Sequence, residues 1–285
     1  YKERVTPSSS LLNYATYVCL FPQLVAGPIV RYSQINEQLK SREHSFNNFS
    51  VGVTRFVLGL SKKIILANLL GTMYDELSTI TQYTVLLFWL KAIGYTLQLY
   101  LDFSAYSDMA IGLGHMFGFS FTENFNYPLI ANSITDFWRR WHITLSSFFK
   151  DYVYIPLGGN RVSFVKWLRN IFVVWFLTGL WHGASWNYIL WGLYFALLLL
   201  IEKKVLKKRL EKHRVLSHVY TLFLVIISFV IFKNESIVEL KKNLIGMFNF
   251  VNYKLFDSTV LYYLKSYAIL ILVSVLASTP LLKNI

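Results

Sequence analysis

The chain is poor in charged residues and almost without cysteine. Only 15% of its 285 residues are Asp, Glu, Lys or Arg, whereas 55% are hydrophobic and 18% are aromatic. A soluble domain usually carries about 25% charged residues, so this composition is typical of a membrane protein. The single cysteine, Cys19, excludes an intrachain disulfide and cysteine-rich metal sites.

Several motifs of enzyme chemistry are also missing. No glycine-rich phosphate loop follows a predicted strand, and no GxSxG elbow is present. No His/Cys cluster has the spacing of a metal site, so we expect no metal and no bound cofactor. The net charge is +13, but no nucleic-acid-binding motif accompanies it. Lys and Arg in cytoplasmic loops are the better explanation, so we expect a lipid bilayer and no nucleic acid as the partner.

Long apolar runs indicate transmembrane helices. They cover residues 11–30, 49–70, 84–101 with a continuation over 103–121, 171–201, 216–232 and 260–277. About 20 helical residues cross the hydrocarbon, so the 31 residues of the run 171–201 are too many for one upright crossing. We expect this run to be strongly tilted, to kink at Gly179, Gly183 or Gly192, or to enter and turn back.

The distribution of basic residues predicts topology. Residues 202–214, EKKVLKKRLEKHR, contain seven Lys/Arg and two Glu, which places this loop in the cytoplasm. Residues 139–169 are basic as well. Either the run 171–201 does not cross simply, or 139–169 is a partly buried re-entrant segment. We favour the second, because the aromatic residues of 139–169 suit an interface or a groove. NFNYP at 124–128 and PLGGN at 156–160 indicate breaks between helices.

Two histidines lie in settings that point to chemistry. His182 sits in WHGASW, inside the charge-free run, and His142 sits in WRRWH. A histidine in hydrocarbon is costly unless it is paired or lines a wet cavity, so an intramembrane histidine indicates function. Imidazole, with an ordinary pKa near 6.5, accepts a proton from a hydroxyl near neutral pH. The alternatives are that His182 only packs between helices and that WRRWH is an interfacial belt.

The two arginines of WRRWH are candidates for anion binding. Consecutive helical residues point about 100° apart, so only Arg139 or Arg140 is expected to face a cavity and bind a phosphate or carboxylate. Helical spacing would place Trp138, Trp141 and His142 on neighbouring faces. We expect His142 to line the same cavity as His182.

Carboxylates inside a membrane need partners. Asp102 and Asp108 lie in LYLDFSAYSDMAIGLG. We predict that they are structural and pair with Arg139, Arg140 or a histidine. The arginine that does not face the cavity is expected to pair with Asp102, Asp108 or Asp136, or to reach the headgroups.

Four segments of the chain resemble the membrane-bound O-acyltransferase family. They are FPQLVAGPIVRY, YLDFSAYSDMAIGLG, ENFNYPLIANSITDFWRRWHITLSSFFKDYVYIPLGGNR and LTGLWHGASW. The similarity runs from about residue 20 to about residue 248. It is greatest to the bacterial branch that O-acetylates alginate and other cell-surface polysaccharides. The PLGGNR segment favours this branch over the one that transfers D-alanine to teichoic acid.

This resemblance implies a fold and a site. The fold is an all-α membrane protein, a multi-span helical bundle around a central funnel or tunnel, with re-entrant or broken helices. His182 is then the presumed catalytic residue and His142 the second signature polar residue, and we expect both to be catalytic. From the residues themselves we expect Asp102, Asp108 and Asn124 to be structural polar residues. Independently of the resemblance, we expect Arg139, Arg140, Trp138, Trp141 and Trp181 to bind substrate. Members of this branch are commonly longer at both ends, so residues 1–285 are expected to be one polytopic domain that is truncated at both ends.

The resemblance also implies an activity. A cytosolic donor, commonly acetyl-CoA, meets a site deep in the bacterial plasma membrane. The acetyl group leaves toward hydroxyls of a cell-surface polysaccharide, directly or through an extracytoplasmic partner of the SGNH type. The alternatives are D-alanyl transfer to teichoic acid, a proton-coupled transporter, or a scaffold for polymer assembly. A transporter would show discontinuous helices in two corresponding halves, which the sequence does not show.

Overall fold

The computed structural model describes residues 10–24 and 27–281, and within these ranges the chain is helical without a strand. The α-helices are α1 (Leu11–Cys19), α2 (Tyr32–Lys40), α3 (Phe46–Ser61), α4 (Asn68–Thr79), α5 (Val85–Met116), α6 (Ile134–Arg140), α7 (Ile143–Phe149), α8 (Phe164–His182), α9 (Trp186–Ile201), α10 (Lys207–Lys212), α11 (Arg214–Lys233), α12 (Ile237–Gly246), α13 (Ser258–Ser266) and α14 (Ala268–Ala277). The shorter elements are the 3₁₀ turns η1 (Phe21–Gln23) and η3 (Pro128–Ile130) and the π-helical segments η2 (Lys62–Ala67), η4 (Lys150–Tyr154) and η5 (Glu202–Leu206). The prediction of an all-α protein is confirmed.

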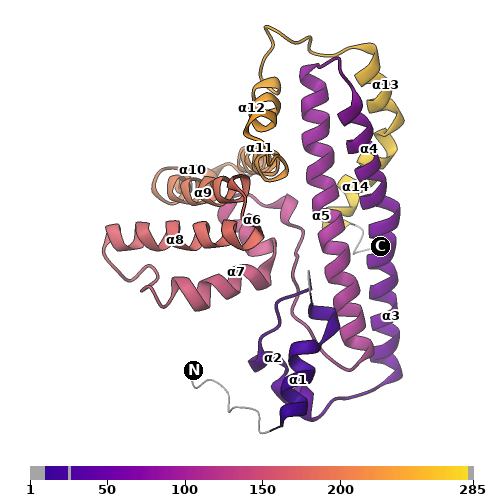
Figure 1. Cartoon of the computed structure of the whole chain (residues 1–285), viewed down its shortest axis with the longest axis vertical. Helices are drawn as coiled ribbons and strands as arrows, with labels where there is room; N and C mark the ends of the chain where they lie inside the picture. Colours follow the sequence, from indigo (N-terminus) through magenta and orange to yellow (C-terminus); the bar gives the residue numbers. More distant parts are fainter. Residues whose placement is uncertain (1–9, 25–26, 282–285) are drawn as a thin grey trace.

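The helices are arranged in two parts. In Figure 1, α3, α4 and α5 stand upright beside α13 and α14, and α6 to α10 form a lobe at their side. Aromatic and aliphatic side chains from both parts share one buried core, which includes Leu101 of α5, Phe137 of α6, Phe195 of α9 and Phe229 of α11. This shared core fixes the lobe against the upright helices.

The upright part is built on one antiparallel helix pair. α3, η2 and α4 form a continuous helical stretch, Phe46–Thr79, that packs along α5. A β-carbon on Gly52 would lie 2.6 Å from the Gly112 carbonyl oxygen, and one on Gly59 would lie 2.8 Å from that of Ala105. Small residues therefore let the two backbones approach closely, as membrane helices commonly do.

Among the described residues, two helices are long and apolar enough to cross a bilayer, Phe46–Thr79 and Arg214–Lys233. α13 and α14 together pass the same test, although they are bent by 52°. These elements match the predicted runs 49–70, 216–232 and 260–277. The predicted run 84–101 and its continuation form the single helix α5 up to Met116.

The run 171–201 turns back on itself. α8 ends at His182, α9 starts at Trp186, and the two helices pack side by side (Figure 1). Gly183 forms the turn at φ 152°, a conformation that glycine adopts readily. A β-carbon on Gly192 would overlap the Trp175 carbonyl, so this glycine brings α9 onto α8. The expectation of a break at a glycine is confirmed; re-entrance of residues 139–169 stays a prediction.

The first predicted run, residues 11–30, is not one helix. α1 ends at Cys19, and the 3₁₀ turn η1 follows with Pro22 inside it. Proline disfavours a helical conformation in the residue before it and lacks the N–H that would continue the ladder. Residues 25–26 of this run lie outside the described residues.

Candidate active site

His142 lies at a sharp break between two short helices. α6 ends at Arg140 and α7 starts at Ile143, with His142 between them at φ 44° and ψ 54°. This is the left-handed region, which residues other than glycine seldom adopt, although histidine is among the more tolerant. WRRWH is therefore not a continuous helix, and the predicted placement of Trp138, Trp141 and His142 on neighbouring helical faces is wrong.

A neighbouring extended segment causes the break. The Asn126 amide donates to the Arg140 carbonyl at 2.9 Å, and the Ile143 amide donates to the Asn124 carbonyl at 2.9 Å. These backbone hydrogen bonds on either side of His142 hold the chain away from helical geometry. The expected break at NFNYP is thus present, and it imposes a second break on the segment that carries the histidine.

Buried polar contacts surround the His142 ring. His142 is 2% exposed, and its Nδ1 lies 3.1 Å from Oδ1 of Asn124, which is fully buried. The Thr144 hydroxyl and amide also contact this oxygen, at 2.9 Å and 3.3 Å. The Phe103 ring packs edge-on against the imidazole at 4.8 Å between centroids. Asn124, predicted to be structural, is therefore a direct neighbour of the candidate catalytic histidine.

His182 occupies the last position of α8. Its Nδ1 lies 2.7 Å from the Thr178 carbonyl oxygen, one helical turn back. Aromatic rings enclose the imidazole, with centroid distances of 4.9 Å to Trp191 and 5.4 Å to Phe232. The histidine is half-buried at the point where α8 turns into α9.

The Trp181 ring links the two histidines. Its centroid lies 5.8 Å from that of His142 and 5.0 Å from that of His182. The structure therefore brings into one neighbourhood two residues that are 40 positions apart in the sequence. Trp181 itself is 50% exposed, so this neighbourhood lies near the surface of the described chain.

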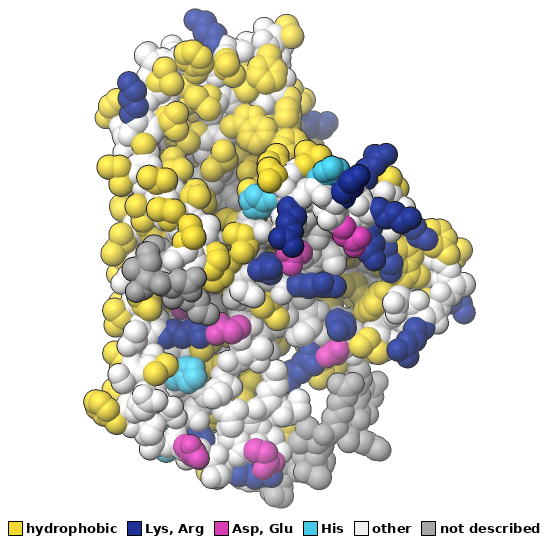
Figure 2. All heavy atoms as spheres, turned by 180° about the vertical axis from the view of Figure 1, so that it is seen from behind, with side chains coloured by type: hydrophobic (Ala, Val, Ile, Leu, Met, Phe, Trp, Pro, Cys, Tyr) yellow, Lys and Arg dark blue, Asp and Glu magenta, His cyan; other side chains and the backbone are white. Residues whose placement is uncertain are grey.

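A cavity lies beside this neighbourhood. It has a volume of about 780 Å³ and is bounded by α6 to α11. Five cationic side chains and two carboxylates line it: Arg139, Lys150, Lys203, Lys207, Arg214, Glu202 and Glu211. Figure 2 shows Lys and Arg side chains gathered over this lobe, whereas the face of the upright helices is largely hydrophobic. An anionic ligand suits this excess of positive charge.

Tryptophan rings lie between the cavity and His182. Trp175 lines the cavity and packs edge-on against Trp138 at 4.6 Å, and Trp138 contacts Trp191 at 5.6 Å. Trp191 in turn contacts the His182 ring. Neither His142 nor His182 is among the residues that line this cavity. The expected shared cavity of the two histidines stays a prediction.

The two adjacent arginines have different surroundings. Arg139 lines the cavity, whereas the Arg140 Nε donates to the Asp136 carboxylate at 3.0 Å. Both lie in α6, so the difference follows from their separation around the helix. Trp141 packs in the aromatic core between Phe137 and Phe229, with centroid distances of 5.5 Å and 5.1 Å. Binding of substrate by Trp138 or Trp141 stays a prediction.

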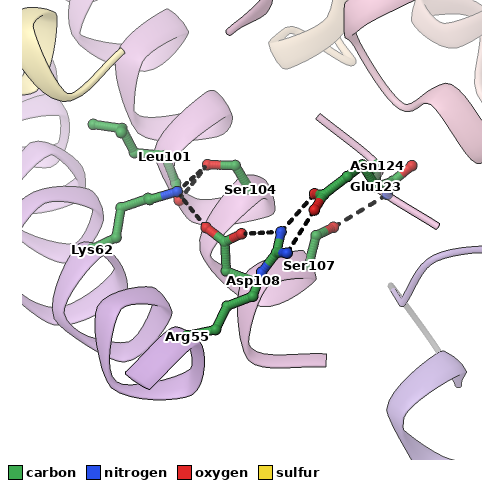
Figure 3. A network of polar contacts seen from close by, with 8 residues as sticks. All are labelled: Arg55, Lys62, Leu101, Ser104, Ser107, Asp108, Glu123 and Asn124. Carbon is green, nitrogen blue, oxygen red and sulfur yellow. Dashed lines mark hydrogen bonds and ion pairs between the residues drawn. The ribbon is translucent and has the colours of Figure 1, made fainter. Parts of the chain in front are cut away.

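Asp102 and Asp108 pair with other cations than we expected. Lys63 contacts Asp102 at 2.6 Å, and Asp108 contacts both Lys62 at 2.6 Å and Arg55 at 3.0 Å. Figure 3 shows Asp108 held between Lys62 and Arg55, with Glu123 on the far side of the guanidinium. The predicted pairing with Arg139, Arg140 or a histidine is wrong, because α3 and η2 pack along this side of α5. The predicted structural role fits these interhelical ion pairs.

Glu202 lines the cavity, although the sequence predicts it only as part of a loop. It is 3% exposed, and its carboxylate accepts the Ile134 amide at 2.6 Å and the Thr135 amide at 3.1 Å. Burial raises the pKa of the Glu202 carboxyl, and the donors at Ile134 and Thr135 act in the opposite direction. The carboxylate thereby ties η5 to the first turn of α6, the helix that carries Arg139. Its only sequence signal is a carboxylate placed directly after an apolar run.

The hydrogen bonds of the Glu202 carboxylate lead to a prediction about stability. Replacing Glu202 with glutamine is expected to lower the free energy of unfolding by about 1–3 kcal/mol, because charge-assisted hydrogen bonds to buried amides are weakened. Thermal unfolding of the purified protein in detergent measures the change. Glu211→Gln is the matched control, since Glu211 also lines the cavity but is exposed and lies 4.0 Å from Lys207. Equal melting temperatures for the two variants would contradict the role of Glu202.

Comparison with known proteins identifies relatives of the chain. Residues 2–234 match the family model described as MBOAT, membrane-bound O-acyltransferase family. A protein of Pseudomonas syringae pv. tomato named "Probable alginate O-acetylase AlgI" is 44% identical over 252 residues, 88% of this chain and 49% of that protein. The "Peptidoglycan O-acetyltransferase" of Helicobacter pylori is 38% identical over 247 residues, 84% of this chain and 47% of that protein.

A more distant relative represents another activity. The "Teichoic acid D-alanyltransferase" of Bacillus subtilis is 32% identical over 195 residues, 64% of this chain and 49% of that protein. The chain spans about half the length of the curated relatives it matches. The family match over most of the chain, together with the apolar helices, shows that this integral membrane protein belongs to the membrane-bound O-acyltransferase family.

Proposed function

We propose that the chain forms the membrane part of an O-acetyltransferase that modifies a bacterial cell-surface polysaccharide. The acetyl group moves from a cytosolic donor across the plasma membrane to polysaccharide hydroxyls, directly or through an SGNH-type extracytoplasmic transferase. The observation that carries this proposal is the pair of histidines on either side of Trp181, in a chain related to named O-acetylases.

In this proposal His182 acts as the general base. Its Nδ1 faces the Thr178 carbonyl, so Nε2 remains to accept a proton. As the acceptor oxygen forms a bond to the acyl carbon, the bond from that carbon to the donor's sulfur breaks. The proton passes from the hydroxyl to Nε2 and then to the leaving thiolate. His142, which contacts the other side of Trp181, donates or accepts a hydrogen bond with a reacting group in the same proposal.

Acetyl-CoA is the donor in this proposal. Its phosphates are polyanionic, and the cavity that Arg139 lines carries five cations against two carboxylates. The cavity volume of about 780 Å³ lies within the range of about 300–1,000 Å³ that is usual for small-molecule sites. Arginine suits a phosphate because its planar guanidinium can bond two oxygens at once.

The acyl group found in the ester distinguishes O-acetylation from the alternative function, D-alanyl transfer to teichoic acid. Ester-linked acetate and D-alanine released from surface polymers by mild base are measured in cells with and without the gene. Loss of acetate is the expected result. Loss of D-alanine would support D-alanyl transfer to teichoic acid instead, and loss of neither would overturn both. The higher identity to the named O-acetylases favours acetate.

The basic segment 202–214, predicted as a loop but helical over η5 and α10, gives a prediction about topology. A cysteine introduced at Lys207, in a chain whose Cys19 is replaced by serine, is expected to react with a membrane-impermeant maleimide only after lysis. The physical reason is that seven Lys/Arg directly after an apolar run favour the cytoplasmic side. Lys207 has a side chain that is 69% exposed, so the thiol is reachable once the membrane is open. Labelling of intact cells would place the loop, and the cavity beside it, outside.

A further inference from the structure

We propose that Asn124 is a positioning residue that holds His142 in the tautomer with its proton on Nδ1 and its lone pair on Nε2. The inference rests on the proposed function only in giving His142 a part in the transfer. The tautomer itself follows from the contacts around Asn124.

The Thr144 backbone N–H fixes the orientation of the Asn124 amide, and the contact with Ser107 is consistent with it. The Thr144 backbone N–H lies 3.3 Å from Oδ1, and a backbone amide can only donate. On the opposite side, Nδ2 donates to the Ser107 hydroxyl of α5 at 3.2 Å, the contact at the right of Figure 3. Exchanging oxygen and nitrogen would place the amide group's donors against the Thr144 donor, so Oδ1 is the atom that faces His142.

The Thr144 hydroxyl supports the same assignment. Its oxygen accepts the Ile29 amide at 3.0 Å, and it lies 2.9 Å from Asn124 Oδ1. With one lone pair occupied by Ile29, the hydroxyl proton is free to point at Asn124. Oδ1 therefore acts as an acceptor toward Thr144 through both the amide and the hydroxyl.

An amide oxygen only accepts, so its contact with His142 Nδ1 at 3.1 Å requires a proton on Nδ1. Neutral imidazole has one N–H, and Nε2 is then left with its lone pair. The other tautomer would set two acceptors face to face in a site where Asn124, His142, Thr144 and Ser107 are each 3% exposed or less. An unmade hydrogen bond is costly in such a buried site.

The link to Ser107 gives the arrangement a rigid support. Ser107 lies on α5, one residue before Asp108, whose ion pairs tie α5 to α3 and η2. The amide of Asn124 therefore couples the His142 ring to the upright helix pair, while the Asn124 carbonyl fixes the backbone at Ile143. Ring orientation and proton position are set by one residue.

The test compares two buried asparagines. Asn124→Leu keeps the size of the side chain and removes both polar atoms. Asn170→Leu is the matched control, because Asn170 is also fully buried and hydrogen-bonded, to the Leu157 and Gly159 carbonyls, but does not touch the histidines. The full chain is labelled with ¹⁵N-histidine, and the His142 signals are assigned from their loss in His142→Asn, which tolerates the left-handed backbone.

In the wild type and in the control Asn170→Leu, Nδ1 of His142 is expected to be protonated. In Asn124→Leu, both tautomers of His142 are expected to be populated. Acetyl transfer by Asn124→Leu is expected to fall about 10²-fold, the effect of misplacing a catalytic group by about 1 Å. Protonation of His142 on Nε2 in the wild type would overturn the proposal. This measurement does not depend on the folding of any variant. An unchanged tautomer in Asn124→Leu would do the same.

A further outcome separates this inference from the proposed function. If the tautomer shifts in Asn124→Leu but acetyl transfer stays at the wild-type rate, Asn124 has no positioning role. The proposed function would be unaffected, because it is tested separately by the acetate released from the polymer. Loss of transfer in both leucine variants, with the His142 signals unchanged in both, would assign the loss to packing and contradict the role of Asn124.

Discussion

Cells that carry His182→Ala are expected to lose about 10²–10⁴-fold in the rate of polymer acetylation, the usual contribution of a general base. The histidine lies at the end of α8, where Nδ1 is engaged by the Thr178 carbonyl and only Nε2 remains to take a proton. The described ring contacts of His182 are with Trp181, Tyr188, Trp191 and Phe232, none of which is an imidazole. Ester-linked acetate on the surface polymer measures the effect.

The membrane abundance of the variant must be measured alongside acetylation. His182 contributes aromatic contacts to Trp191 and Phe232, so its removal has a packing cost as well as a chemical one. His44→Ala is the control, since His44 is exposed and far along the chain from the site. Normal acetylation at normal abundance in His182→Ala would remove this residue from the chemistry and would favour a scaffold role.

The second large effect is expected at Arg139. Replacing Arg139 with glutamine should weaken acetyl-CoA binding by about 1.5–3 kcal/mol, which is the range for a hydrogen bond to a charged group. Each 1.4 kcal/mol is a factor of ten in the dissociation constant. Arg139 lines the basic cavity, and glutamine keeps a polar side chain there while removing the charge. Binding of the donor to the purified protein, measured by calorimetry, gives the value.

The neighbouring arginine provides the control. Arg140 is bonded to Asp136 and donates to the Asn126 carbonyl at 3.3 Å, so Arg140→Gln is expected to leave donor affinity nearly unchanged. The two variants have the same net charge, which removes general electrostatics from the comparison. Equal affinities of the wild type and both variants for acetyl-CoA would support the alternative that WRRWH is an interfacial basic belt. Equal weakening in both would show that charge, and not a contact, is responsible.

Local features of the fold could be predicted from the sequence. Hydropathy placed helical runs at 49–70, 216–232 and 260–277, because an apolar stretch long enough for a bilayer is visible without any knowledge of its neighbours. The break in 171–201 could also be predicted, because the run is too long for one upright crossing and contains glycines. The C-terminal ends of α1 and α5 were predicted less accurately, because a helix end depends on only a few capping and turn residues.

Contacts between distant segments could not be predicted in this way. Asp108 pairs with Lys62 and Arg55 because α3 packs along α5, and nothing near Asp108 in the sequence indicates that packing. The break at His142 depends on bonds to residues 124–126, which precede it by a whole helix. The different surroundings of Arg139 and Arg140 follow from helix geometry, which is why the sequence predicted a difference without assigning it.

The left-handed backbone of His142 affects how genetic data on this residue should be interpreted. A β-branched residue or alanine at this position would lose the imidazole and would also carry a conformational penalty of about 1–2 kcal/mol. Inactive variants of that kind cannot separate chemistry from backbone strain. Asparagine tolerates the left-handed region, and glycine adopts it freely. His142→Asn and His142→Gly are therefore the informative alleles, and a mutational scan should rank this position by them.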